Sequence, residues 1–129
     1  MKLSENFSMH EFQCPCCKGV FNLQVGLLDK LEDFREVCGE ALRINRGGGS
    51  RCPAYQAAIY INKGEEPIWT SRHLKGEAAD ISKISGGVFT DRELEQARLI
   101  FGGVGATESR EWIHVDIRNS QKFWHYQGE

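Results

Sequence analysis

Apolar residues recur every three or four positions in a stretch near the N-terminus, which predicts a helix with one buried face. The stretch runs from Leu23 to Cys38, and Gly39 follows it as a helix-ending residue. Between the apolar positions stand charged residues, which form a solvated outer face. The predicted buried positions are Leu27, Leu28, Leu31, Phe34, Val37 and Cys38.

Start and stop signals predict two further helices. Pro53 suits the first turn of a helix that ends near Asn62. Thr90 and Glu93 form a capping box, after which apolar residues continue until Gly102 and its neighbouring glycine. The apolar residues of this third helix are Leu94, Ala97, Leu99, Ile100 and Phe101.

Short alternating stretches predict three strands. Residues 41–45 precede a glycine-rich, flexible turn, and residues 78–84 alternate imperfectly. Residues 112–117 alternate sharply and are expected to form the last strand, with Trp112, His114 and Asp116 on its polar face. We therefore predict an α+β fold, with helices packed against a small and mainly antiparallel sheet, as a single domain over residues 1–129.

Composition narrows the class of protein. The chain has 129 residues, of which 40% are hydrophobic and 26% charged, as in a folded globular protein rather than a disordered one. The net charge of -2 provides no basic field, so we expect no nucleic-acid partner. Neither a signal peptide nor a membrane span is recognisable, so we expect a cytoplasmic location as synthesised. The sequence does not determine an oligomeric state.

Two histidines and an aspartate are candidate metal ligands. His73 and Asp80 are seven residues apart, about 10.5 Å of rise on a continuous helix, so they converge only if Gly76 turns the chain. His114, on the polar face of the strand at 112–117, supplies a third ligand. Three protein ligands with a position left for water are typical of catalytic zinc.

Glu111, three residues before His114, is the candidate general base. In a regular strand this offset places the two side chains on opposite faces, so Glu111 reaches the metal only if the chain bulges before Trp112. The alternative is a solvated carboxylate on a loop, in which case Glu108 is the reserve candidate.

The two motifs resemble the signature of the zinc D-Ala-D-Ala carboxypeptidase and dipeptidase family, whose fold is shared by Hedgehog signalling domains. They are Ser71-x-His73-x-x-Gly76-x-Ala78-x-Asp80 and Glu111-x-x-His114. The likeness extends more loosely from Phe7 and Phe12 to Trp124, and the small form is similar to bacterial and phage cell-wall peptidases. It implies zinc as cofactor and the stem peptide of peptidoglycan as substrate. Because that substrate lies outside the membrane and no export signal is recognisable, we expect action on the cell wall after release by lysis or by a phage holin, as for a phage- or prophage-encoded protein.

The resemblance also implies that Arg51 holds a substrate carbonyl or carboxylate, a role suited to its planar fork. The alternative is a pair with a surface acid. Ser71 and Trp112 are candidate substrate contacts, although local hydrogen bonding and aromatic packing would also explain them. Asp116 either orients a ligand histidine or pairs with Arg118. Gln56 stands where the family usually has asparagine.

Five cysteines leave other possibilities open. Cys14 and Cys17 have the C-x-x-C spacing, which Cys38, Cys52 or His10 could complete into a second metal site or a disulfide, although reduced thiols are the expectation. Two functions compete with the metallopeptidase: a zinc-containing binding module of the same fold without turnover, and a thiol hydrolase that uses Cys52 or Cys17 with a histidine. His10 and His125 are expected at the surface.

Overall fold

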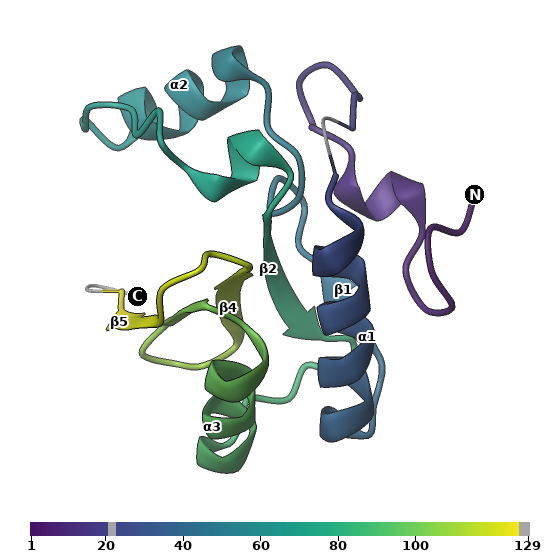
Figure 1. Cartoon of the computed structure of the whole chain (residues 1–129). Coiled ribbons are helices and arrows are strands. Elements are labelled where there is room, and N and C mark those ends of the chain that lie inside the picture. The colour runs from purple at the N-terminus through teal and green to yellow at the C-terminus, as the bar shows by residue number, and fades with distance from the viewer. Residues whose placement is uncertain (21–22, 127–129) are drawn as a thin grey trace.

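The fold is built around a five-stranded sheet, shown in Figure 1 by a computed structural model that describes residues 1–20 and 23–126. The strand order is β1-β2-β4-β3-β5, in which β5 is parallel to β3 and every other pair is antiparallel. The predicted α+β class with a mainly antiparallel sheet is confirmed. The strands are β1 (Leu42–Ile44), β2 (Ala78–Lys83), β3 (Gly103–Ala106), β4 (Trp112–Asp116) and β5 (Lys122–His125).

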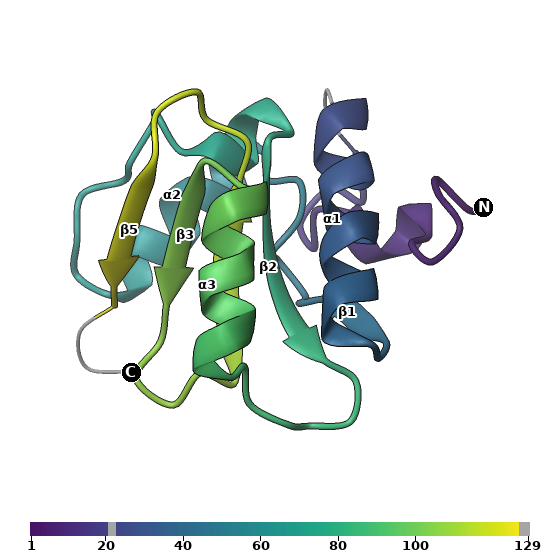
Figure 2. The ribbon, with the colours of Figure 1, turned by 60° about the horizontal axis from the view of Figure 1, so that its bottom comes forward.

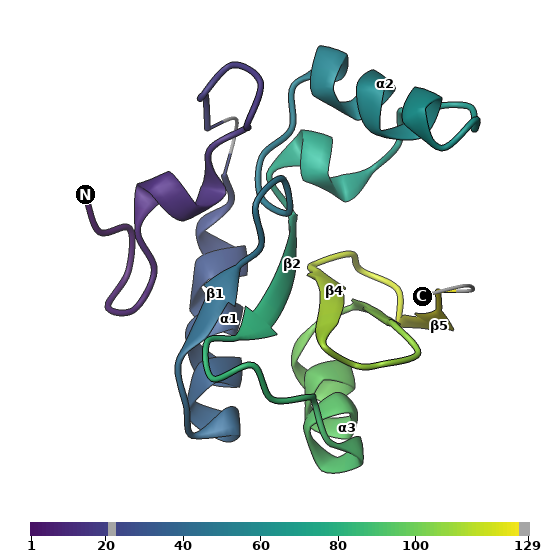
Figure 3. The same cartoon turned by 180° about the vertical axis from the view of Figure 1, so that it is seen from behind.

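Three α-helices form where the periodicity and the caps predict them: α1 (Val25–Cys38), α2 (Pro53–Asn62) and α3 (Asp91–Ile100). Both halves of the Thr90–Glu93 capping box are present at α3. Two short 3-10 helices, η1 (Met9–Phe12) and η2 (Arg72–Lys75), were not predicted. Helices α1 and α3 lie side by side in front of the sheet in Figure 2, whereas α2 and η2 gather at one end of the molecule (Figure 3).

The core lies between α1, α3 and one face of the sheet. Leu31 and Phe34 of α1 and Ile81, Ile113 and Val115 of the sheet are completely buried there. Alternation along β2 and β4 then directs the intervening polar side chains to the opposite face, away from α1 and α3. That opposite face carries Asp80, Ser82, Trp112, His114 and Asp116.

Several local predictions were wrong. Strand β3 was not predicted, and β5 follows β4, so residues 112–117 are not the last strand. Leu99 faces solvent, 71% exposed, whereas Phe101 at the end of α3 is buried. The turn at Gly47, Gly48 and Gly49 was expected to be flexible, but all three glycines are buried. Within the described part of the chain, no helix has both the length and the apolar character needed to cross a membrane.

Candidate metal centre

His73, Asp80 and His114 converge on one point, although they come from η2, β2 and β4. Asp80 Oδ1 lies 3.3 Å from His73 Nε2 and 3.1 Å from His114 Nδ1. All three residues are buried. The predicted ligand set is therefore brought together by the fold.

Local structure explains why residues seven apart in sequence meet. The Ser71 hydroxyl accepts a hydrogen bond from the amide of His73 at the start of η2. Gly76 then adopts the left-handed conformation, with φ of 69°, and turns the chain into β2 as the sequence predicted. Asp80 stands directly opposite His114 on the neighbouring antiparallel strand.

The second ring nitrogen of each histidine has a buried acceptor. His73 Nδ1 lies 3.1 Å from the carbonyl oxygen of Gly49, and His114 Nε2 lies 2.8 Å from Asp116 Oδ2. The carbonyl of Gly49 can only accept, so the neutral His73 ring carries its proton on Nδ1 and directs the lone pair of Nε2 at Asp80. His114 keeps a proton on Nε2 towards Asp116, and a metal ion could take the place of a proton between its Nδ1 and Asp80.

The charges of the site follow from burial and from these contacts. Burial lowers the pKa of His73, which favours the neutral ring that a metal requires. Burial opposes charge on Asp80, but His73 and His114 outweigh it and hold the pKa of Asp80 well below its usual range. Burial likewise opposes charge on His114, yet its contacts with Asp116 and Asp80 raise its pKa.

The donor set fits zinc. Tetrahedral zinc with bonds near 2.0–2.1 Å to nitrogen and oxygen separates its ligand atoms by about 3.3 Å. The two distances to Asp80 Oδ1, 3.3 and 3.1 Å, are close to this value without any movement of the backbone. Two imidazoles and a carboxylate, with one side left open, match the ligand set of a catalytic zinc site.

Arg51 is tied to a metal ligand rather than to a surface acid. It donates hydrogen bonds from Nε to the carbonyl of Gly47, from Nη1 to Gln56 Oε1 and from Nη2 to Asp80 Oδ2, at 2.8, 3.1 and 3.3 Å. Gln56 is completely buried and donates in turn to the carbonyl of Ile68. The arginine therefore holds the carboxylate oxygen that does not face the histidines.

The centre opens into a hollow of about 640 Å³, which we call the cationic hollow. Asp80 is the only carboxylate among its described lining residues. Predicted contacts Ser71 and Trp112 both line it, as do Trp124 and Tyr126 of the C-terminal segment. The residues that give the hollow its charge are Arg51, Lys63, Arg72, Lys75, Arg118 and Lys122.

Glu111 lies outside the cationic hollow. It is exposed and lines a smaller neighbouring hollow with Ser82 and Lys83, while Trp112 forms a wall of both hollows. Its position agrees with the strand-parity argument, which separated Glu111 from His114. Glu108 is also exposed. The role of either residue as a base stays a prediction.

Asp116 contacts both of its predicted partners, and two further contacts around the site were not predicted. Asp116 binds His114 Nε2 and also accepts from Arg118 Nη2, at 2.7 Å. The ring of Trp124 packs on His114 with centroids 5.3 Å apart. A β-carbon on Gly103 would lie 2.3 Å from Asp116 Oδ1, so β3 needs glycine beside the site. The contacts of Trp124 with His114 and of Gly103 with Asp116 each join two strands, so no short sequence motif could predict them.

The cysteines lie elsewhere. Cys17 and Cys52 lie with Cys14, and none of the described residues that line the cationic hollow is a cysteine. Cys38 has its own contact with Glu93. His10 and His125 are exposed, as predicted. The thiol-hydrolase hypothesis therefore finds no pairing of Cys17 or Cys52 with His73 or His114.

The fold and the three candidate ligands have the arrangement of a hydrolase-type metal site. The model of the Peptidase M15 family matches residues 5–116, and the chain belongs to this family of metal-dependent peptidases. The match includes both metal-ligand motifs and ends at Asp116, before Trp124. No curated protein matches the chain.

Proposed function

We propose that the protein is a zinc-dependent metallopeptidase that hydrolyses stem-peptide bonds of peptidoglycan, as a D,D-carboxypeptidase or an endopeptidase. The observation that carries this proposal is the set His73, Asp80 and His114, which converge at the base of an open, cationic hollow. Membership of Peptidase M15 supports the peptidase chemistry. The D,D-specificity comes from the resemblance of the motifs.

The chain's own residues would bind the metal and keep it in place. His73 Nε2, Asp80 Oδ1 and His114 Nδ1 are the ligand atoms. Zinc bound there would supply Lewis acidity, which lowers the pKa of water to about 7 and polarises the scissile carbonyl. Gly49 and Asp116 fix the two rings, so the ligands need not reorient when the metal binds.

Arg51 would position the substrate. A guanidinium has five N–H groups, of which three are used by Gly47, Gln56 and Asp80. The remaining N–H groups belong to a side chain that lines the cationic hollow next to Asp80. They are suited to a substrate carbonyl or carboxylate, because charge-assisted bonds to oxygen are strong in a partly dry site.

Glu111 is proposed as the general base. Its carboxylate would take a proton from the attacking water and deliver it to the nitrogen of the leaving amine. No hydrogen bond or ion pair with another described residue holds the exposed carboxylate, and Trp112 lines both its hollow and the cationic one. A rotation of this side chain past Trp112 on substrate binding would bring it to the site.

The charge of the hollow supports an anionic peptide as substrate. Lys63, Lys75 and Lys122 line it without forming an ion pair with any described residue, whereas Arg72 and Arg118 are paired with Glu77 and Asp116. Stem peptides carry free carboxylates, which such a lining attracts. We therefore expect an anionic stem peptide to be cleaved faster than its amidated form.

The test is hydrolysis of a stem pentapeptide ending in D-Ala-D-Ala and of a cross-linked stem-peptide dimer, each with and without chelator. Cleavage that stops with chelator and returns with zinc is expected, and the matched peptide ending in L-Ala-L-Ala should stay intact. Zinc bound at the histidine site with no cleavage of either substrate would instead favour the binding module. Chelator-resistant cleavage that Cys52→Ala abolishes would favour the thiol hydrolase.

A further inference from the structure

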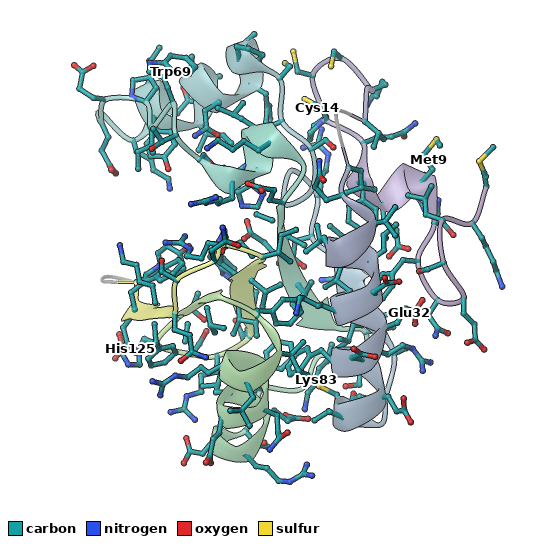
Figure 4. All side chains as sticks on the ribbon, viewed as in Figure 1. Met9, Cys14, Glu32, Trp69, Lys83 and His125 are labelled. Carbon is teal, nitrogen blue, oxygen red and sulfur yellow. The ribbon has the colours of Figure 1, made fainter. Side chains whose placement is uncertain are left out.

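Three cysteines from two distant segments form a second cluster of metal-ligating atoms. Cys14 and Cys17 lie in the turn after η1, and Cys52 immediately precedes α2. Their three sulfur atoms lie within 4.8 Å of one another. Figure 4 shows Cys14 at this turn, beside the start of α2 and away from the sheet.

The turn that carries the C-x-x-C sequence is closed by its own backbone. The amide of Cys14 donates to the carbonyl of Gly19 at 2.9 Å, and the amide of Lys18 donates to the carbonyl of Cys14 at 2.8 Å. Lys18 has φ of 64°, which residues other than glycine rarely adopt. The left-handed residue Lys18 thus closes the turn that contains Cys14 and Cys17.

Backbone amides point at the sulfur atoms. The amide of Cys52 donates to Cys14 Sγ, and the amide of Tyr55 donates to Cys52 Sγ, each at 3.4 Å. Burial opposes ionisation of Cys14, but hydrogen bonds from the amides of Cys17, Cys52 and Cys16 outweigh it and lower its pKa to about 7. Cys52 is also the N-cap of α2, so its sulfur lies at the end of the helix where backbone amides are unpaired.

A fourth thiol lies near the cluster. Cys16 is in the same turn and interacts with the Cys52 side chain, but its sulfur lies outside the group of three that are within 4.8 Å of one another, so it would have to move closer to bind. Tetrahedral zinc with bonds of about 2.3 Å to sulfur separates its ligands by about 3.8 Å, which agrees with a cluster compact to within 4.8 Å. Four thiolates close the coordination shell, as in structural zinc sites.

We propose that Cys14, Cys16, Cys17 and Cys52 bind a second zinc ion, which is structural and clamps the N-terminal segment onto the start of α2. The clamped segment adjoins the catalytic centre. The amide of Ser50 donates to the carbonyl of Phe12 at 2.9 Å. The turn between Gly47 and Cys52 also provides Gly49, the acceptor for His73, and Arg51, the partner of Asp80. This site does not depend on the peptidase activity.

Metal content separates the two centres. Protein purified with reductant and without chelator is expected to contain two equivalents of zinc by elemental analysis. His73→Ala/His114→Ala should retain one equivalent, and Cys17→Ser/Cys52→Ser should also retain one. Cys38→Ser, the control, should retain two, because Cys38 lies at the end of α1. A double-histidine variant that has lost all of its zinc would overturn the proposal.

A second measurement does not require the cysteine variants to fold. The native protein loaded with cobalt should show thiolate-to-cobalt charge-transfer absorption, and only Cys38 should react with a thiol reagent before chelation. All five cysteines should react after chelation under denaturing conditions. Absence of the charge-transfer band would contradict the site. So would the finding that the four cysteines form disulfides and that the cluster contains no zinc.

Discussion

Asp80 and His114 face each other across two antiparallel strands, with Asp80 Oδ1 3.1 Å from His114 Nδ1. The pairing fixes one carboxylate and one imidazole through the register of β2 and β4, and a slip of either strand by one residue would turn its side chain towards the core, away from its partner. His73 is the remaining ligand, and the turn at Gly76 brings it to this pair. The metal centre is therefore as rigid as the sheet on which it is built.

Asp116→Ala is expected to weaken zinc binding at the histidine site by about 10–100-fold, because His114 would lose the acceptor that orients its ring. Competition with a chromophoric chelator measures this change. Asp91→Asn is the matched control, since Asp91 is 89% exposed and pairs only with Arg110. Equal zinc affinity in Asp116→Ala and the native protein would show that the contact does not orient the ligand.

Glu111→Gln should leave zinc content unchanged while kcat falls by about 10²–10⁴-fold, the scale of general-base catalysis. Glu108→Gln, a matched change at another exposed acid three residues earlier, should keep native turnover. Steady-state kinetics on the stem pentapeptide distinguish the two. If Glu108→Gln is the inactive variant, the base has been assigned to the wrong carboxylate.

Gly103→Ala should lower the free energy of unfolding by about 1–3 kcal/mol, because the new methyl group would overlap the Asp116 carboxylate. Its zinc affinity should fall as well. Gly26→Ala, within α1, is the contrasting change. A β-carbon at this position would contact only Ile117 Cδ1, at an ordinary van der Waals distance of 3.8 Å. That variant should gain about 0.5–1 kcal/mol from helix propensity. Urea unfolding gives both values, and a stabilised Gly103→Ala would contradict the close packing.

The buried pair of Lys83 and Glu93 should make stability depend on pH. Lys83 Nζ lies 2.8 Å from Glu93 Oε1, and Lys83 sits between α1 and α3 (Figure 4). Burial opposes charge on Glu93, but Lys83 and the amide of Thr90 outweigh it and lower its pKa. The resulting stabilisation is present above the unfolded pKa near 4.5 and is lost as the pH falls through the lower folded value.

Urea unfolding of Glu93→Gln against the native protein tests this pair. Glu93→Gln should lower the free energy of unfolding at neutral pH, although Glu40 still pairs with Lys83, and the difference from native should shrink between pH 5 and pH 3. Glu95→Gln, an exposed change on the same helix, should differ little from native at any pH. If the difference in unfolding free energy between Glu93→Gln and the native protein does not change with pH, the charge of Glu93 does not stabilise the fold.

The convergence of the candidate ligands and the main elements were predictable because their signals are local. The spacing of His73, Gly76 and Asp80 contains the turn that joins them, and the alternation from Trp112 to Asp116 states which face each residue takes. Strand β3 was not predicted because it has glycines where a strand usually has larger side chains. Glycine is needed there because Asp116 and Trp124, on other strands, lie very close to its backbone.

Long-range contacts could not be predicted from the sequence, because the two residues of each contact lie far apart along the chain. The bond from Arg51 to Asp80 joins residues 29 apart, and the contact of Cys52 with Cys14 joins residues 38 apart. Spacing along the chain contains no information on such pairs. The sequence offered Cys52 as one of three possible partners for the C-x-x-C pair, and the fold selects it over Cys38 and His10.

The glycine turn beside the metal centre rests on the N-terminal segment. A β-carbon on Gly49 would lie 2.7 Å from the Cα of Phe12, and the same glycine's carbonyl accepts from His73. The segment that contains Phe12 therefore supports the turn that orients His73, about sixty positions further along the chain. Anyone who shortens this enzyme for crystallisation, or who fuses it to a cell-wall targeting module, would have to leave that segment whole.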